Sequence, residues 1–471
     1  MDSLATAPVG AGESATTGSA SPWVKRVAQA GIFFAAMPYI GVAALPSDTQ
    51  PVAFVIAAIG VALLLARSRL HISPLAWPLV VMALLATVSF VLRGAFEDPG
   101  FIWLVRSYYG YASAPIIVTF FLYYLPVLRK EEIARAIDIA LVVAFIGFLL
   151  NAFGQTEVVQ HVVNRALFPG RVMAARGLPG FFAEPSRVSE QMAIFFFCYC
   201  LTGRLTTPRV VGLVVASLLA AAGQMFVIFA HIVLAYGGAA ALLVVIRRVL
   251  SLRAVTRLVL AGVVVAGFLS FHELIAADLI RLGFPTRGIT AISRIVRDGR
   301  RYIGQDTGMM DKVAGTLQAA ATLVDNPVTF KLAAAAEDEY AATVTPTYSW
   351  LMRVLFESDT LRFQRRPNSA LGIWIIEFGV IGLVAALAFV WLLLRRAARA
   401  PRAAQLPVLW ATLFLIQVLF IKLSLANPSL WLLSALIWVS AVSGSSLRLR
   451  PSDRRSRGTG RGGGAPRQTN K

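Results

Sequence analysis

Apolar runs that approach the length of a bilayer crossing recur along almost the whole chain, and this recurrence constrains the fold more than any motif. A helix needs about 20 mostly apolar residues to cross a hydrocarbon layer of about 30 Å. The composition agrees, because 57% of the residues are hydrophobic and 14% are charged, whereas a soluble domain has about 25% charged residues. The stretch 209–246 is too long for one crossing, so we expect it to divide at Gly223 and Gln224. The sequence therefore predicts an all-α, polytopic integral membrane protein with about twelve spans, near 27–45, 51–66, 74–92, 101–127, 133–153, 187–203, 209–222, 224–246, 257–271, 371–394, 405–422 and 429–444.

The distribution of lysine and arginine orients these spans. Basic clusters fall in alternate connections, and cytoplasmic connections are the ones that carry an excess of Lys and Arg. With twelve crossings, all these clusters and both termini lie on the cytoplasmic side. The net charge of +20 is then largely topological, and no nucleic-acid partner is expected. The clusters are Lys25–Arg26, Arg67 with Arg69, Arg129–Lys130, Arg204 with Arg209, 247–257 and 395–402.

These assignments divide the chain into five parts. Residues 1–24 form an N-terminal tail and 447–471 a basic C-terminal tail, both cytoplasmic and expected to be disordered. Residues 25–271 form a membrane domain of about nine spans that includes an outer loop at 154–186. Residues 272–370 form a large extracytoplasmic loop, and 371–446 hold the last spans.

The large outer loop is expected to pack helices over a cavity rather than to act as a linker. Leu317, Ala320, Ala321 and Val324 fall at helical spacing within it, and such spacing gives a helix an apolar face. The sequence therefore predicts a packed helix near 315–325.

Arginines on the outer side run against the usual charge preference. The loop 154–186 holds Arg165, Arg171 and Arg176, and the loop 272–370 includes Arg301, Arg365 and Arg366. A planar guanidinium binds phosphate through two parallel hydrogen bonds, so these arginines are candidates for binding a lipid-linked phosphate. The alternative is a solvated basic loop that touches anionic lipid head groups.

The sharpest local motif runs from Arg176 to Arg187, with the sequence RGLPGFFAEPSR. Residues 177–180 predict a turn, and the two phenylalanines that follow are suited to hold it at the membrane interface. The Glu-Pro-Ser sequence then begins a span, with proline suited to the first helical turn, and the unpaired N–H groups there favour anions. Glu184 is either a general base or the ion-pair partner of Arg176 or Arg187.

At these residues the chain resembles the bacterial O-antigen polymerase and O-antigen ligase superfamily of membrane glycosyltransferases. Residues 176–186 are similar to the polymerase-type motif that precedes a span. Residues 316–327 (TLQAAATLVDNP) resemble the family's loop helix that ends in Asn-Pro. Residues 368–383 resemble the start of the span after the loop, and 427–431 (NPSLW) the start of the last span.

The resemblance implies a glycosyltransferase C-like fold and inverting transfer of glycan of the hexosyltransferase type. The donor would be a polyprenyl-pyrophosphate-linked glycan and the acceptor a glycan or lipid, at the outer face of the bacterial inner membrane. Repeat units for O-antigen, capsule or exopolysaccharide would be polymerised or ligated without a cofactor or metal, with a chain-length regulator and a flippase as further partners. The implied catalytic residues are Glu184, Arg176 and Arg187, and the implied substrate-binding residues are Arg165, Arg171, Arg301, Arg365, Arg366, Asn368 and His231.

One departure from the family concerns the distinction between polymerase and ligase. Ligases carry a histidine–asparagine pair before the span that follows the loop, and this chain has Pro367 and Asn368 there. The absence of that histidine favours a polymerase and leaves the general base unassigned.

Several polar residues inside the apolar runs have two interpretations each. His231 either lines a catalytic cavity or makes a hydrogen bond between helices, since an ionisable group in a span is costly and often functional. Arg106 and Glu377 either face the same cavity, or form salt bridges, or extend their charged groups towards the membrane surface (snorkelling). Cys198 and Cys200, two residues apart on a helix, point away from each other and predict neither a disulfide nor a metal site.

Two other classes of function stay open. A transporter or flippase of lipid-linked oligosaccharide is expected to have internal repeats and broken helices that meet near the membrane midplane. A non-catalytic scaffold for envelope assembly would leave Glu184 and the outer arginines replaceable. The sequence has no clear repeat between its halves, and its charges concentrate at the outer ends of spans, which favours the enzyme.

Overall fold

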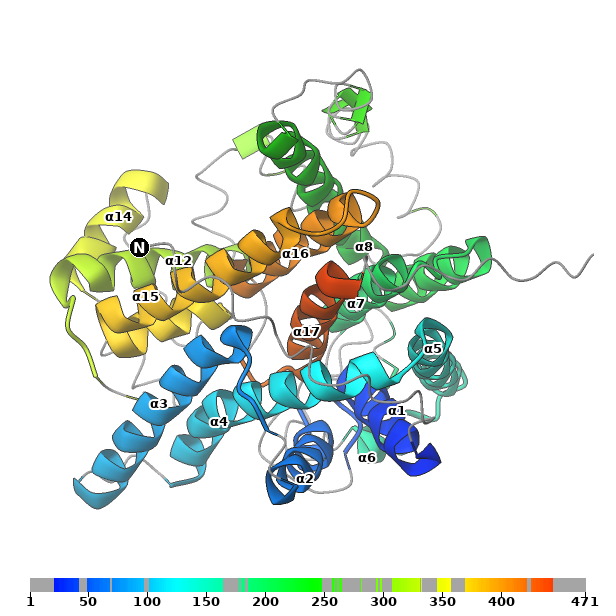
Figure 1. Ribbon diagram of the computed structural model, residues 1–471. Coiled ribbons are helices and arrows are strands. Elements are labelled where there is room, and N and C mark those ends of the chain that lie inside the picture. Colours follow the sequence, from blue (N-terminus) through cyan, green and yellow to red (C-terminus); the bar gives the residue numbers. More distant parts are fainter. Residues whose placement is uncertain are drawn as a thin grey trace, which may run out of the picture.

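The computed structural model describes residues 21–41, 49–67, 70–96, 101–163, 178, 180–182, 185–247, 256–257, 259–260, 262–264, 281, 294, 297–298, 307–330, 332, 345–356, 369–421 and 425–443. All regular secondary structure in these residues is helical. Figure 1 shows the helices as one bundle. They are α1 (Pro22–Ala36), α2 (Val52–Ala66), η1 (Pro74–Ala76), α3 (Trp77–Phe96), α4 (Phe101–Tyr124), η2 (Leu125–Val127), α5 (Lys130–Ala152), α6 (Thr156–Val162), α7 (Pro185–Thr202), α8 (Thr207–Arg247), α12 (Thr307–Asp325), α14 (Pro346–Phe356), α15 (Ala370–Ala398), α16 (Gln405–Ile421) and α17 (Pro428–Ser443).

Five described segments are long and apolar enough to cross a membrane: Pro74–Ala95, Leu104–Val127, Lys130–Ala152, Ile228–Arg247 and Ala370–Ala398. Four shorter apolar helices accompany them: Val52–Ala66, Thr207–Ala220, Gln405–Phe420 and Pro428–Val442. The chain is thus an all-helical protein, in its described part, with segments suited to span a membrane. A helix lies at each predicted span except 257–271, of which only single positions are described. The number of twelve crossings stays a prediction.

The first span is shorter than predicted and begins earlier. α1 runs from Pro22 to Ala36, whereas the apolar run predicted 27–45. Proline suits the first turn of a helix because its missing N–H has no partner there in any case. At the other end, Pro38 disfavours helical backbone at Met37, whose φ and ψ of −118° and 65° lie outside the helical region.

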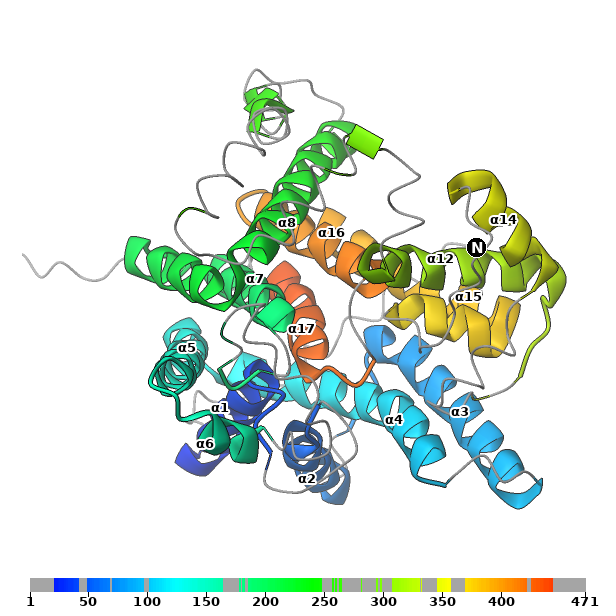
Figure 2. The same cartoon turned by 180° about the vertical axis from the view of Figure 1, so that it is seen from behind.

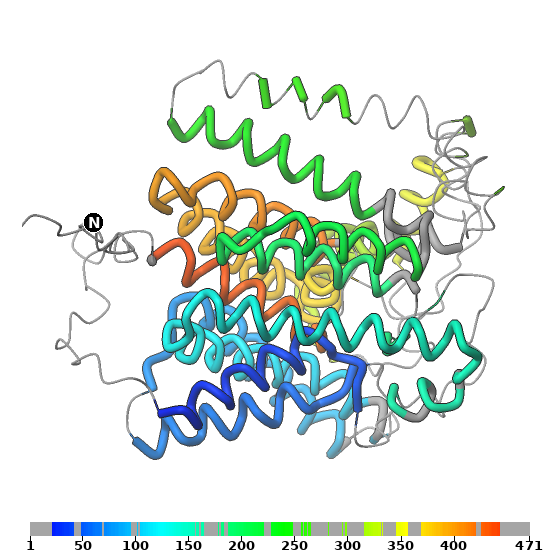
Figure 3. Tube along the Cα trace, turned by 90° about the vertical axis from the view of Figure 1, so that its right-hand side faces the viewer, coloured from blue at the N-terminus to red at the C-terminus, as the bar shows by residue number. Residues whose placement is uncertain are grey.

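The long helix α8 accounts for two predicted spans. Its 41 residues correspond to a rise of about 60 Å, roughly twice the hydrocarbon thickness. Thr207–Ala220 and Ile228–Arg247 are both apolar, and Figure 3 shows these two parts of α8 as two rods of the bundle. The predicted division at Gly223 and Gln224 falls between them.

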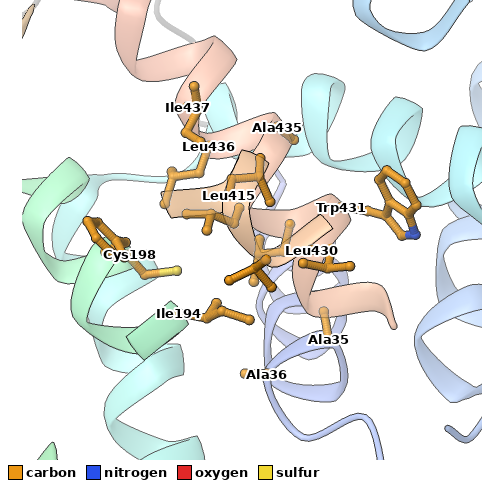
Figure 4. Packing of buried hydrophobic residues seen from close by; sticks show 14 of the residues in the cluster. Ala35, Ala36, Ile194, Cys198, Leu415, Leu430, Trp431, Ala435, Leu436 and Ile437 are labelled. Atoms are coloured by element: carbon orange, nitrogen blue, oxygen red, sulfur yellow. The ribbon is translucent and has the colours of Figure 1, made fainter. Parts of the chain in front are cut away.

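The helix α17 is the centre of the bundle. It packs on α1, α4, α7, α15 and α16, and Figure 1 shows it surrounded by them. Residues 428–437 are buried without interruption, which is the pattern of a helix with no lipid-facing side. Figure 4 shows Leu430 and Trp431 of α17 beside Ala35 of α1, Ile194 of α7 and Leu415 of α16.

Figure 3 shows α1 beginning and α17 ending at one end of the bundle, and α14 at the opposite end. Near the start of α1, ion pairs and hydrogen bonds connect α5 to α1 and to α8. Lys25 forms an ion pair with Glu132 of α5 at 3.3 Å. Arg209 of α8 donates two hydrogen bonds to the Asp138 carboxylate, at 2.6 and 2.8 Å. This bidentate geometry is the strong form of an arginine–carboxylate contact.

The described part of 272–370 contains two packed helices. α12 contacts α14 through Leu317 and Ala321, and α15 through Ala319 and Leu323. The predicted packing face was therefore partly wrong. Ala320 and Val324 are exposed, because α12 packs on two partners at once and turns a different side to solvent.

Asp325, at the end of α12, caps the start of α14. Its carboxylate accepts hydrogen bonds from the Thr347 backbone N–H at 2.9 Å and the Thr347 hydroxyl at 2.5 Å. Hydrogen bonds from Thr345 and Thr347 hold the pKa of the Asp325 carboxyl below its usual value. A carboxylate at a helix N-terminus is also favoured by the helix dipole. This stabilisation is present at neutral pH and is lost as the pH falls through the lowered pKa.

The orientation of the bundle can be tested by cysteine labelling. Val328 is 89% exposed and follows α12, whereas Leu205, in the turn between α7 and α8, is 38% exposed. With Cys198 and Cys200 replaced, we expect a membrane-impermeant maleimide to label Val328→Cys in spheroplasts and to label Leu205→Cys only after permeabilisation. The reverse pattern would overturn the predicted orientation.

The capping of α14 can be tested by proteolysis. Asp325→Ala removes both acceptors for Thr347, so we expect α14 to open more often and trypsin to cut faster after Arg353 in detergent-solubilised protein at pH 7. Asn326→Ala, at the exposed neighbouring position, is the control and should cut like the wild type. Equal cleavage rates for Asp325→Ala and the control would contradict the capping role.

Candidate functional site

Most predicted site residues lie outside the described part of the chain. Of these residues, the structure describes Arg187 and His231. His231 is half-buried on α8, and Arg187 lies in the first turn of α7. The site is therefore built from the described side chains around these segments. Outside the described residues lie Arg165, Arg171, Arg176, Glu184, Arg301, Arg365, Arg366 and Asn368.

Arg187 has an ion-pair partner on its own helix. Its guanidinium lies 3.2 Å from the carboxylate of Glu190, and both side chains are largely buried. Residues three apart on a helix are neighbours, so the spacing of Arg187 and Glu190 could have indicated this ion pair. The sequence-based prediction named only Glu184 as an acidic partner for Arg187. The pair holds the guanidinium at the start of α7.

The glycine–phenylalanine turn before α7 is anchored on α5. Gly180 has a φ of +55°, a conformation that glycine adopts without steric cost. Its N–H donates to the Asn151 side-chain oxygen at 2.7 Å. Phe182 is fully buried and packs on Phe148 and Tyr39. The turn predicted at 177–180 is thus present at Gly180, with its aromatic residues inside the protein.

A polar seam joins α7 to α17 and α1. The Ser429 hydroxyl lies 2.9 Å from the Gln191 side-chain amide and 2.7 Å from the Ala35 carbonyl. α1 ends at Ala36, so the Ala35 carbonyl has lost its intrahelical partner. The Ser429 hydroxyl is the donor, and the Gln191 side-chain oxygen and the Ala35 carbonyl are its two acceptors, which share its one proton. Asn427 accepts from the Ser429 backbone N–H at 3.0 Å and caps α17.

The helix α15 is broken at Gly379, where φ is +54° and ψ is −131°. The break removes the hydrogen bond that Val380 N–H would make to the Ile376 carbonyl. Val380 N–H instead donates to the Pro327 carbonyl at 2.9 Å, and the Ile376 carbonyl accepts from the Thr329 hydroxyl at 3.4 Å. One segment after α12 therefore supplies partners to both groups of this lost pair.

This segment, residues 326–330 with Leu332, is called the strap. Leu332 is buried and fastens the strap to α3: its N–H donates to the Ser89 hydroxyl at 2.7 Å, and its carbonyl accepts from Arg93. Arg93 is itself 5% exposed. Sequence analysis did not single out Ser89 or Arg93, and their only signal was an arginine directly after an apolar run. The strap thus joins α12, α15 and α3.

Glu377 lies two residues before Gly379, where the helix is broken, and is 1% exposed. It accepts a hydrogen bond from the Tyr111 hydroxyl of α4. The Tyr111 ring meets Phe378 edge to face at 5.6 Å, and Phe378 meets Phe330 of the strap at 5.6 Å. Of the two charges predicted inside spans, Glu377 is thus hydrogen-bonded between helices, and Arg106 is half-buried on α4.

The segments quoted for the resemblance are linked by these contacts. The first leads into α7, which meets the 427–431 segment through Gln191 and Ser429. α17 packs on α4, and α4 holds Glu377 of the 368–383 segment through Tyr111. Pro327, the last residue of the 316–327 segment, then meets Val380. The helices that contain or follow these segments therefore pack on one another: α7 on α17, α17 on α15, and α15 on α12.

The described residues include no group of three or more His, Cys, Asp or Glu side chains placed to hold a metal ion. Cys198 is a buried free thiol and Cys200 a half-buried one. Comparison of the chain with models of known protein families, with curated proteins and with solved structures finds no match.

The break in α15 can be tested with one glycine. In Gly379→Ala the new methyl group would collide with the Pro327 carbonyl, and a left-handed backbone costs a residue with a Cβ about 1–2 kcal/mol. We expect a lower thermal unfolding midpoint for the purified protein and faster proteolysis near the strap. Gly94→Ala on α3, where an added methyl meets nothing within 4 Å, is the control. A wild-type midpoint for Gly379→Ala would contradict the strap's role.

Proposed function

We propose that the chain is a membrane glycosyltransferase that polymerises polyprenyl-pyrophosphate-linked oligosaccharide repeat units at the outer face of the bacterial inner membrane. The observation that carries the proposal is the packing of four helices on one another, α7, α12, α15 and α17, which contain or follow the segments that resemble the O-antigen polymerase and ligase superfamily. Contacts across the bundle join them although up to about 250 residues separate them. Such a juxtaposition is expected when the segments build one site.

The reaction assigned to this region is an inverting displacement. A hydroxyl of the acceptor glycan attacks the anomeric carbon of the donor, a new C–O bond forms, and the bond to the pyrophosphate breaks. The hydroxyl proton passes to a base, for which Glu184 is the candidate, and the polyprenyl pyrophosphate leaves with the negative charge. No redox step and no nucleotide sugar take part.

Arginine has a defined role in this reaction. Negative charge grows on the leaving pyrophosphate in the transition state, and fixed donors aimed at that charge lower the barrier. Arg187 is suited to the role because the partly buried pair with Glu190 restrains its guanidinium. It also lies at a helix N-terminus, which favours anions. Arg176 and the outer-loop arginines would complete the cradle.

A transporter or flippase of lipid-linked oligosaccharide is the second candidate, and the break in α15 favours it. Transporters place broken helices at substrate sites near the membrane midplane. In this chain, however, the strap supplies partners to both groups of the pair lost at the break. We prefer the enzyme because a transporter site would leave those groups for an ion or a substrate.

The proposal is tested with purified variants and a lipid-linked donor, following both donor binding and glycan product. Lysine keeps the charge but loses the planar fork, so Arg176→Lys, Arg187→Lys and Arg366→Lys should each lose about 10²–10³ in rate, the loss typical of a well-placed donor. Glu184→Gln should keep donor binding and lose transfer. Arg67→Lys, next to the end of α2, is the control and should turn over normally.

Two outcomes would redirect the assignment. If all four site variants turn over like the wild type, the catalytic site lies elsewhere. If the protein moves lipid-linked donor between leaflets of proteoliposomes and makes no product, it is a transporter. In a deletion strain, loss of long chains with single capped units retained indicates a polymerase, whereas free lipid-linked polymer indicates a ligase.

A further inference from the structure

The short helix α14 has two apolar sides, and one of them packs on α12. Tyr348 and Met352 are buried and contact Ala321 and Leu317 of α12. A helix that served only as a surface element would be polar on its other side. In α14 the other side instead carries large apolar residues.

The outward side of α14 is built from residues three and four apart. Trp350 is 58% exposed and Val354 46%. Arg353 is exposed among them, on the same side as Trp350. A tryptophan, an arginine and an aliphatic residue on one helix side are the composition of helices that lie in the interface of a bilayer.

The position of α14 in the fold matches that composition. Figures 1 and 2 show α14 at the rim of the bundle, beyond α12, and Figure 3 shows it at the end opposite the start of α1. α12 in turn packs on α15 and α16, which are among the apolar helices suited to a membrane. A helix held at the rim and end of a membrane bundle stands where the head groups of the surrounding lipid begin.

We propose that α14 lies in the outer head-group layer of the membrane, with its outward side turned to lipid. Trp350 places its ring at the boundary of head groups and acyl chains, Val354 enters the acyl region, and the Arg353 guanidinium binds lipid phosphate. This assignment goes beyond the proposed function and does not depend on it.

The size of the outward side argues for lipid rather than a partner protein. α14 has 11 residues and is about 16 Å long, whereas a stable protein interface buries about 800 Å² on each partner. Two large apolar side chains and one arginine supply only part of such an area. They suffice for lipid contact, because the rest of the chain already holds α14 beside the bilayer and little orientational freedom remains to be lost.

The test places an environment-sensitive fluorophore on α14 of the full chain in nanodiscs. Cys198 and Cys200 are replaced, and the probe is attached at Val354→Cys or, as the control, at Thr316→Cys, an exposed position on α12. We expect lipids with a nitroxide near the head group to quench the Val354 probe several-fold more than the Thr316 probe. Aqueous iodide should give the opposite order.

Two results would overturn the proposal. Strong quenching of the Val354 probe by iodide, without quenching by lipid nitroxide, would place α14 in water. Protection from both quenchers would mean that a protein, either a second copy or a partner, covers it. Correct folding of the Val354→Cys variant is checked separately: its thermal unfolding midpoint should match that of the cysteine-free parent.

The role of Arg353 is tested in the same probe background. In nanodiscs that contain phosphatidylglycerol, Arg353→Glu should reduce lipid quenching at position 354, whereas Arg353→Lys should retain most of it. In phosphatidylcholine alone the difference between these variants should shrink, because less negative charge is present at the surface. Equal quenching of both variants with phosphatidylglycerol would overturn the contact between Arg353 and lipid phosphate.

Discussion

Every backbone N–H and carbonyl inside a membrane must find a partner within the protein, because hydrocarbon offers none. The break of α15 at Gly379 would violate this requirement if α15 stood alone. The strap supplies partners to both groups of the lost pair, through the Pro327 carbonyl and the Thr329 hydroxyl. The position of α12, and through it of α14, therefore follows from a local defect in a membrane helix. The segment that holds α12 and α14 therefore belongs to the fold of the helical bundle and is not an appendage.

The buried polar contacts define the register of the bundle. Ser429 has to reach both Gln191 and Ala35, and Tyr111 has to reach Glu377. Apolar surfaces slide past each other at little cost, whereas a shift of one residue would leave these groups without partners in a medium of low dielectric constant. These few contacts thus specify how α1, α4, α7, α15 and α17 align, and apolar packing supplies the bulk of the contact area.

Length and apolarity were enough to predict the long apolar helices, because a membrane demands both from every crossing, but they did not predict the short helices α6 and α14. Local sequence was not enough where a distant segment decides. Nothing around Gly379 announces a left-handed backbone, since its cause, Pro327, lies 52 residues earlier. The packing face of α12 was partly wrong for the same reason: two partners, α14 and α15, share it. Arg187 was predicted as a site residue, but its ion-pair partner Glu190 was not, although the spacing of three residues on a helix would have indicated it. The contact between Tyr111 and Glu377 could not be predicted, because it joins two helices far apart in the sequence. Most predicted site arginines and Glu184 lie outside the described residues.

The central position of α17 has a consequence for biosynthesis. Helices enter the membrane in the order of translation, so α17 arrives after α1, α4, α7, α15 and α16, which surround it in the finished bundle. Until then its place is empty, and Gln191 and the Ala35 carbonyl face lipid or a transient occupant. A ribosome that stops before residue 428 would leave a protein with most of its spans and an open polar seam, which is the kind of defect that membrane quality control can recognise.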